Sequence, residues 1–90
     1  YRIVFKETDD QPAGKWGAVH AAEAKQPLGP YKLLPEPIIK NERVEGPALA
    51  LIGGKTLLYV DYYVNHRYGA RETSDWKSWR DVSAETKVVI

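Results

Sequence analysis

The strongest chemical candidate in this sequence is a single carboxylic acid, Glu45, in the tripeptide Glu45-Gly46-Pro47. Gly46 permits a close approach of the backbone to another group, and Pro47 suits the first position of a strand, where no ladder donor is needed. A carboxylic acid acts as a general acid where burial or a like-charged neighbour keeps it protonated. From these residues alone, the competing interpretation is an exposed glutamate at the start of a strand, because glutamate is rarely fully buried.

Several other kinds of chemistry lack their residues. The chain has no cysteine, which removes disulfides, thiol nucleophiles and cysteine-based zinc sites. Its two histidines, His20 and His66, lie far apart in the sequence, so no local pair of histidines faces a metal. No phosphate loop, nucleophile elbow or dinucleotide fingerprint is present. We therefore expect neither a metal site nor a cofactor site within this chain.

The composition is that of a small globular domain. Of the 90 residues, 43% are hydrophobic and 28% are charged, which argues against disorder. Thirteen basic and twelve acidic side chains leave a net charge of +1, too weak a field to hold a nucleic-acid backbone. No apolar run is long enough to span a bilayer. Both ends of the sequence lie in strand-like runs, and we expect the chain to be a piece of a longer one.

Strand signals dominate the sequence. Six prolines and seven glycines divide it, and no long segment keeps the spacing of an amphipathic helix. Gly53-Gly54 suits a tight hairpin, because both positions tolerate positive φ. The β-rich runs between turns predict strands over residues 1–6, 16–22, 47–52, 55–63 and 67–72. Together they predict an all-β fold.

The sequence also repeats itself. Trp16-Gly17-Ala18 is similar to Tyr68-Gly69-Ala70, and each is followed by a polar turn and an aromatic residue, Tyr31 or Trp79. Repeats of about 40 to 50 residues with four strands each are typical of propeller blades. A propeller needs about four to eight blades, so two consecutive antiparallel four-stranded blades would form part of a larger ring.

The order of motifs from residue 44 onward resembles glycoside hydrolase family 43. In order, these motifs are Glu45-Gly46-Pro47, an apolar strand, Gly53-Gly54-Lys55, the aromatic strand 57–63, Arg67-Tyr68-Gly69-Ala70 and Ser74-Asp75-Trp76-Lys77-Ser78-Trp79. Upstream, residues 1–6 resemble the aromatic strand of a preceding blade, and residues 21–31 resemble a polar turn ending in Gly-Pro-aromatic. The family consists of five-bladed β-propeller enzymes that act on glycans containing arabinose, xylose or galactose. The resemblance implies that residues 1–41 end one blade and residues 42–90 form most of the next.

The resemblance gives Glu45 a role. In the family, the glutamate of Glu-Gly-Pro is the general acid that protonates the leaving glycosidic oxygen, and Glu45 has that position. In the family, the catalytic base and an aspartate that tunes the pKa of the acid lie on earlier blades. No residue of this chain corresponds to either. A histidine on a later blade also lies outside this chain, as would the ligands of any calcium ion in the intact propeller. The resemblance implies an inverting hydrolase, with two carboxyl groups about 6.5 to 9.5 Å apart.

Propeller geometry adds a set of expected sugar-binding residues. Glu45 would lie at the start of an innermost strand, and the turn after Tyr63 would return to the same substrate face, as would residues 6–15 in the earlier blade. The expected binding residues are Asp61, Tyr62, His66 and Arg67. Arginine offers donors to sugar hydroxyls, and aromatic rings stack on sugar faces. The competing interpretation places Tyr59 and Tyr63 in packing between blades and pairs Arg67 with Glu72 or Asp61.

Two further segments have alternative interpretations. Trp76 and Trp79 suggest a platform for sugar stacking, but the equivalent turn in the family lies near a blade's outer strands, so we expect them in the core. The run Glu7-Thr8-Asp9-Asp10 is compatible with a calcium loop. It lacks the glycine and the later glutamate of an EF-hand, so we expect a solvated loop.

Two classes of function follow. The first is an enzyme that cleaves arabinosyl, xylosyl or galactosyl linkages of plant-type glycans, of which this chain alone would be inactive. The second is a propeller that binds glycan or protein without catalysis. The expected partners are an oligo- or polysaccharide and the remaining blades, with neither nucleic acid nor membrane. The resemblance favours a secreted or periplasmic bacterial protein, but the lack of disulfides also fits the cytosol, and the compartment stays open.

Overall fold

The computed structural model describes residues 1–8 and 16–86, and this part of the chain is all-β, as predicted. The chain divides into two compact units, Tyr1–Glu42 and Arg43–Ile90. The boundary expected from the sequence lies between residues 41 and 42. Within the described residues the helical content is a single 3₁₀ turn, η1 (Ser83–Glu85).

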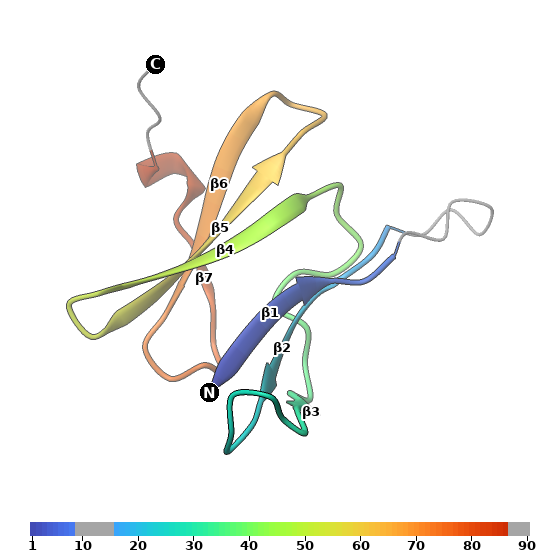
Figure 1. Cartoon of the computed structure of the whole chain (residues 1–90). Coiled ribbons are helices and arrows are strands. Elements are labelled where there is room, and N and C mark those ends of the chain that lie inside the picture. The colour runs from blue at the N-terminus through green and yellow to red at the C-terminus, as the bar shows by residue number, and fades with distance from the viewer. Residues whose placement is uncertain (9–15, 87–90) are drawn as a thin grey trace. The chain divides into compact units, whose positions relative to one another are not determined.

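The first unit contains a three-stranded antiparallel sheet. Its strands are β1 (Arg2–Lys6), β2 (Val19–Glu23) and β3 (Lys32–Leu33), in the order β1-β2-β3 (Figure 1). Val19 is fully buried together with Ile39, and the Val19 amide donates to the Ile39 carbonyl at 2.9 Å. β2 begins three residues later than predicted, because the Trp16 amide donates to Asn41 Oδ1 at 2.7 Å instead of to a strand.

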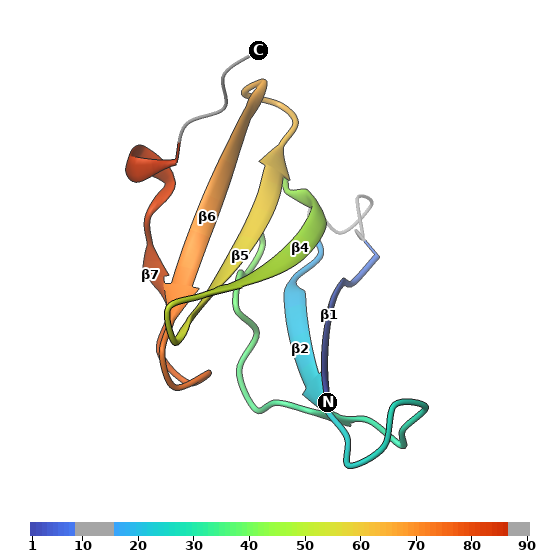
Figure 2. The ribbon, with the colours of Figure 1, turned by 60° about the vertical axis from the view of Figure 1, so that its left-hand side comes forward.

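The second unit contains a four-stranded antiparallel sheet built from consecutive hairpins. Its strands are β4 (Glu45–Ile52), β5 (Lys55–Tyr62), β6 (Arg67–Thr73) and β7 (Arg80–Asp81), in the order β4-β5-β6-β7 (Figures 1 and 2). The two-residue turn between β4 and β5 has φ 55 at Gly53 and φ 79 at Gly54, as predicted for this hairpin. β4 starts two residues earlier than expected, so Glu45 is part of the strand.

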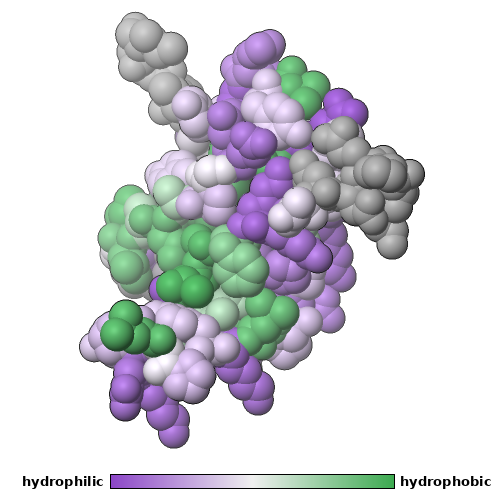
Figure 3. Space-filling view, turned by 45° about the vertical axis from the view of Figure 1, so that its right-hand side comes forward, coloured by the Kyte–Doolittle hydropathy of each residue, from purple (hydrophilic) through white to green (hydrophobic). Residues whose placement is uncertain are grey.

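Burial alternates along β5, the strand bonded to two neighbours for most of its length. Thr56, Leu58, Val60 and Tyr62 are buried, whereas the residues between them are half-buried. The period of two assigns these two sets to opposite faces of the sheet. Large apolar side chains also reach the surface, among them Leu51 and Ile52 at the end of β4, and Figure 3 shows apolar surface in green beside hydrophilic surface in purple.

The two sheets end in the same way. β3 and β7 are two-residue strands that the sequence pattern did not predict, and each directly follows the repeated aromatic residue, Tyr31 or Trp79. Glu23 pairs with Lys32 across β2 and β3, and Glu72 pairs with Arg80 across β6 and β7. Both units therefore contain a meander of three strands with matching registers at the last hairpin.

Hydrogen bonds fix the correspondence between the two meanders. The Leu34 amide donates to the Ala21 carbonyl, and the Val82 amide donates to the Ala70 carbonyl, each at 2.9 Å. Ala21 thus corresponds to Ala70, whereas the similarity of the tripeptides matched Ala18 to Ala70. The two units therefore do repeat each other. The alignment between them, however, is shifted by three residues from the one that the tripeptides predict.

The turn between β6 and β7 is held by two side chains. Thr73 Oγ1 donates to the Ser78 carbonyl at 2.7 Å and accepts from the Trp76 amide at 2.9 Å. Asp75 Oδ1 accepts from the amides of Lys77 at 2.8 Å and Ser78 at 2.9 Å. These backbone hydrogen bonds, that from Ser78 first, lower the pKa of the Asp75 carboxyl below its ordinary value of 3.8.

The first prediction concerns Gly69, which lies under the ring of Tyr62. A Cβ at Gly69 would overlap the Tyr62 ring and lie 2.6 Å from Ser83 Oγ. We expect Gly69→Ala to lower the free energy of unfolding by about 1 to 3 kcal/mol, as overpacking does in cores. Urea unfolding followed by circular dichroism measures this change.

A double-mutant cycle provides the control for Gly69. In a Tyr62→Ala background the ring is absent, so Gly69→Ala should lower the free energy of unfolding much less. An equal loss in both backgrounds would show that the ring is not what excludes a side chain at this position.

The second prediction concerns acid stability. The unfolded chain binds a proton at Asp75 more readily than the folded chain does, so this carboxylate stabilises the fold above pH about 4, and its contribution is lost as the pH falls through the lowered folded-state pKa. Asp75→Asn keeps an oxygen acceptor but has no charge. We therefore expect its unfolding temperature to change less between pH about 5 and 2 than that of the parent chain.

Asp75→Ala serves as the comparison, because it removes the acceptor as well as the charge. It should lower the unfolding temperature already at neutral pH, where Asp75→Asn has a small effect. If the parent chain and Asp75→Asn lose stability equally on acidification, the turn carboxylate does not contribute to acid sensitivity.

Candidate functional site

Glu45 lies at the first position of β4, where the strand carries a bulge. Glu45 pairs with Asp61, but the next regular pair is Ala48 with Tyr59, so Gly46 and Pro47 together stand opposite a single residue of β5. Gly46 has φ 57, a left-handed conformation that glycine adopts without strain. A bulge bends its strand and re-aims nearby side chains. The Glu45 side chain is exposed at this end of the sheet.

Three side chains form a row across the sheet at the bulge. Asp61 stands directly opposite Glu45 on β4 and directly opposite Tyr68 on β6. Residues directly opposite each other in antiparallel strands project from the same face. Glu45 and Tyr68 are exposed, and Asp61 is half-buried. Two carboxyl groups and a tyrosine ring therefore share one accessible face at this end of the sheet.

Tyr62 lies on the opposite face and is packed in place. Only 7% of its surface is exposed. The Arg71 guanidinium donates from Nη2 to the Tyr62 hydroxyl at 3.1 Å, and the Arg67 guanidinium lies 4.3 Å above the centre of the ring. Gly69 leaves the space that the ring fills. The ring is therefore covered by protein groups, and its hydroxyl already accepts a hydrogen bond.

Arg67 is exposed and stacks on Tyr62, which differs from both pairings considered for it. Glu72, one of those partners, is instead bound by Lys55 at 3.3 Å and by Arg80 at 3.4 Å. A guanidinium held over an aromatic ring keeps its edge donors directed outward. Arg67 is thus positioned to donate hydrogen bonds at the start of β6.

His66 belongs to the turn between β5 and β6. It is exposed and has φ 52, and the Asn65 amide donates to the Tyr62 carbonyl at 3.0 Å within the same turn.

The five predicted site residues share one end of the second sheet but not one face. Adjacent strand residues point to opposite faces, so Asp61 and Tyr62 cannot contact a ligand from the same side.

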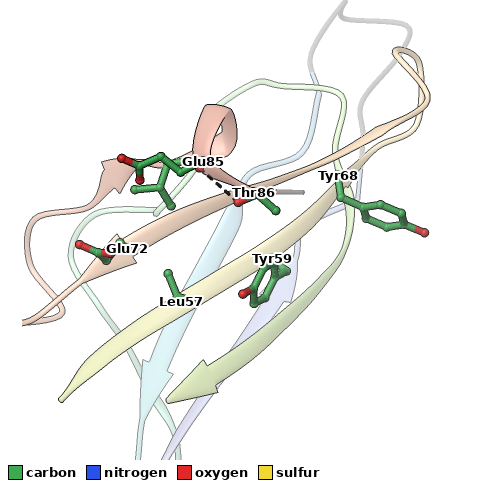
Figure 4. A pocket seen from close by; sticks show the side chains of 7 residues that line it. Leu57, Tyr59, Tyr68, Glu72, Glu85 and Thr86 are labelled. Atoms are coloured by element: carbon green, nitrogen blue, oxygen red, sulfur yellow. Dashed lines mark hydrogen bonds between the residues drawn. The ribbon is translucent and has the colours of Figure 1, made fainter. Parts of the chain in front are cut away.

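An open hollow lies on the face that carries Glu45 and Asp61. It has a volume of about 660 Å³. Leu57 and Tyr59 of β5 and Tyr68 of β6 line it from the sheet, with Glu72 beside them (Figure 4). Residues that follow β7 complete it, namely Val82, Glu85 and Thr86. Sequence reasoning missed this hollow, although the alternation along β5 already places Leu57, Tyr59 and Asp61 on one face.

The tryptophans of the turn before β7 pack against each other. The rings of Trp76 and Trp79 meet edge to face, with centroids 5.3 Å apart and an angle of 87° between their planes. Both residues are half-buried. A ring that is used edge to face by a neighbour presents less of its surface to a flat ligand, so the pair has the character of packing rather than of an open platform.

The possible calcium loop of the first unit is only partly described. Asp9 and Asp10 lie outside the described residues, as do the later residues of the expected 6–15 segment. Glu7 Oε2 lies 3.0 Å from His20 Nε2, and the His20 ring stacks on Phe5 at 5.6 Å between centroids. Glu7 is therefore engaged with a histidine, and nothing observed here directs it at a cation.

A metal-binding cluster and similarity to known proteins would each point to a function, and neither is found. Within residues 1–8 and 16–86, no three acidic, histidine or cysteine side chains gather in a way that would hold a metal ion. The same residues contain no helix of the length and apolarity needed to cross a membrane. No protein-family model matches the chain, and comparison with curated proteins and with solved structures gives no match. The proposed function therefore depends on the geometry at the end of the second sheet where Glu45 and Asp61 lie.

Proposed function

We propose that the chain is a segment of a glycoside hydrolase of the family 43 type, in which Glu45 is the general acid. The observation that carries the proposal is the bulge at Glu45, where this residue stands directly opposite the carboxylate residue Asp61. Its exposure at the start of the strand is shared with the competing interpretation and does not separate the two. Like charges directly opposite each other are unfavourable in a sheet, and this departure from the usual pairing is what favours a functional role. Local features that break such rules are common at functional sites.

The proposed reaction is hydrolysis with inversion. The Glu45 carboxyl group donates its proton to the glycosidic oxygen as the bond from that oxygen to the anomeric carbon breaks. A water molecule attacks the anomeric carbon from the opposite side and loses a proton to a second carboxylate. By the resemblance, that second carboxylate belongs to an earlier blade, so this chain contributes the acid and not the base.

The neighbours of Glu45 have supporting roles in the proposal. Asp61 accepts hydrogen bonds from hydroxyl groups of the sugar that Glu45 protonates, because it lies on the same face. His66 contributes donors from the turn before β6. Arg67 and Tyr62 stand opposite each other on the other face of the sheet, so they have no role toward this sugar in the proposal. None of these roles requires a cofactor.

The two matching meanders support a repeating architecture. β1-β2-β3 and β5-β6-β7 share strand order and the register of the last hairpin. Such a repeat is what successive propeller blades would show, and a ring of blades needs more repeats than two. The proposed partners are therefore the remaining blades of a longer protein and an oligo- or polysaccharide substrate.

A second candidate function is a propeller that binds a glycan without cleaving it. The tyrosine-lined hollow favours it, because binding there does not depend on the chemistry of Glu45. The two candidates differ in whether the Glu45 carboxyl group is needed for turnover, and that difference is measurable.

The third prediction is that the 90-residue chain alone has no glycosidase activity. Removing one member of a cooperative catalytic set lowers kcat by several orders of magnitude, and here the base is absent. Release of arabinose from an aryl arabinofuranoside should equal that of a Glu45→Gln control. A rate clearly above the control would contradict the assignment of the base to another blade.

The fourth prediction concerns Glu45 in the intact longer protein. Glu45→Gln is nearly isosteric and should preserve the fold. Its kcat/KM on a natural glycan should fall by about 10² to 10⁴, the contribution of a positioned proton donor. The loss on an activated aryl glycoside should be much smaller, because a good leaving group hardly needs the proton.

The matched control for this measurement is Glu36→Gln. Glu36 is an exposed glutamate of the first unit, paired with Lys40 at 3.0 Å. It should change neither rate. Small and equal losses on both substrates for Glu45→Gln would instead assign Glu45 a structural role and favour the binding propeller.

A further inference from the structure

The first sheet leaves an apolar face open. Ile3 stands opposite Ala22, which stands opposite Leu33, so the three side chains project from the same face, together with Phe5 two residues along β1. Ile3 and Phe5 are each 39% exposed and Leu33 is 50% exposed, so water reaches all three. The charged residues of β1 alternate with them and project from the other face. We call the surface of Ile3, Phe5 and Leu33 the isoleucine face.

The corresponding face of the second sheet is buried. In the alignment that the hydrogen bonds of the two meanders fix, Ile3 corresponds to Leu58 and Phe5 corresponds to Val60. Leu58 is 0% exposed and Val60 is 1% exposed. An apolar face that is buried in one unit and open in its repeat indicates a surface that lacks its cover.

The opposite face shows the reverse pattern. Val19, which corresponds to Tyr68, is fully buried in the first unit, whereas Tyr68 is 53% exposed in the second. Tyr68 borders the open hollow with Leu57 and Tyr59, as Figure 4 shows. We call the surface of these three residues the tyrosine face. Each chain therefore leaves one face of each kind open, the isoleucine face on the first unit and the tyrosine face on the second.

The charges beside the tyrosine face are already paired. Lys55 Nζ lies 3.3 Å and Arg80 Nη2 lies 3.4 Å from Glu72 Oε1, and Arg80 Nη2 also lies 3.6 Å from Glu85 Oε2. An uncharged partner surface can therefore cover the hollow without leaving a charge unpaired. The isoleucine face is such a surface, since its three side chains are aliphatic or aromatic.

From these observations we propose that the two open faces bind each other, so that a second copy of this chain docks head to tail on the first. The isoleucine face of one copy packs into the hollow of the tyrosine face of the other. Repeating units contact their neighbours through such unlike faces, and the burial of apolar surface drives the contact. Because the two faces differ, the contact is heterologous, and copies add to one another until a ring closes or an open chain of copies grows.

The inference rests on the repeat of the two meanders, which is part of the proposed function, and not on the role of Glu45. In a longer protein, the adjoining units take the place of the second copy. Docking closes the hollow to a glycan, so the inference counts against a binding propeller that holds its glycan there.

The experiment is sedimentation velocity on the 90-residue chain over a range of concentrations, at which its average mass should rise with concentration. Ile3→Lys on one face and Tyr68→Lys on the other should each weaken association at least about tenfold, because the contact then buries an unpaired ammonium group. Leu28→Lys and Leu51→Lys are the matched controls, since these leucines are 99% and 81% exposed and lie outside both faces. They should associate as the parent chain does, and circular dichroism checks that every variant keeps the fold.

A mixture of the two face variants gives the sharper result. Ile3→Lys keeps an intact tyrosine face and Tyr68→Lys keeps an intact isoleucine face. Their equimolar mixture should therefore form a dimer of one chain of each kind and nothing larger. If each face bound its own kind instead, one of the two variants would still self-associate by itself.

Several outcomes would overturn the inference. These are a parent chain that stays a monomer up to about 1 mM, a mixture of the two face variants that stays monomeric, or association that neither face variant weakens. Association that appears only in a chain ending at Thr86 would assign the hollow to the chain's own last residues. None of these results changes the expectation for Glu45→Gln in the intact protein, so either proposal can fail without the other.

Discussion

The contact between Tyr62 and Gly69 governs the geometry of the second sheet. The ring occupies the space into which any side chain at position 69 would project, and Arg71 holds the ring by its hydroxyl. Val60 stands opposite Gly69, so this contact defines the register between β5 and β6. A slip of one residue would move every side chain of a strand to the other face. Tyr68 would then leave the face of Asp61 and with it the hollow.

The bulge at Glu45 interrupts the regular pairing of β4 with β5, whereas the contact of Tyr62 with Gly69 maintains regular pairing between β5 and β6. Gly46 adopts φ 57 and Pro47 offers no amide, so the first pair of β4 is separated from the remaining ladder. The same departure exposes a carboxylate beside another carboxylate. The sheet is therefore regular where it must hold its register and irregular where it presents Glu45.

The sequence predicted the long strands because their patterns are strong. β5 is rich in tyrosine, leucine and valine, and the Gly53-Gly54 turn fixes where it begins. β3 and β7 were missed because two residues carry no period. The end of the sheet at which the site residues gather follows from strand order alone. Their division between two faces depends on the parity of each residue in its strand, and treating Asp61 and Tyr62 as one group ignored that parity. Tyr68 was missed for the same reason, since its place opposite Asp61 follows only from the register of β6.

The comparison of the two meanders separates what the scaffold needs from what the proposed sites add. In both units a glutamate of the middle strand is bound by a basic side chain of the strand before it, Arg2 with Glu23 at 3.0 Å and Lys55 with Glu72 at 3.3 Å. That ion pair therefore belongs to the scaffold, and the hollow uses an existing group for its rim. At the positions that correspond to Tyr59 and Tyr68, the first unit has Val4 and the fully buried Val19. The shared meander therefore accepts different side chains at these two positions, whereas the ion pair recurs in both units.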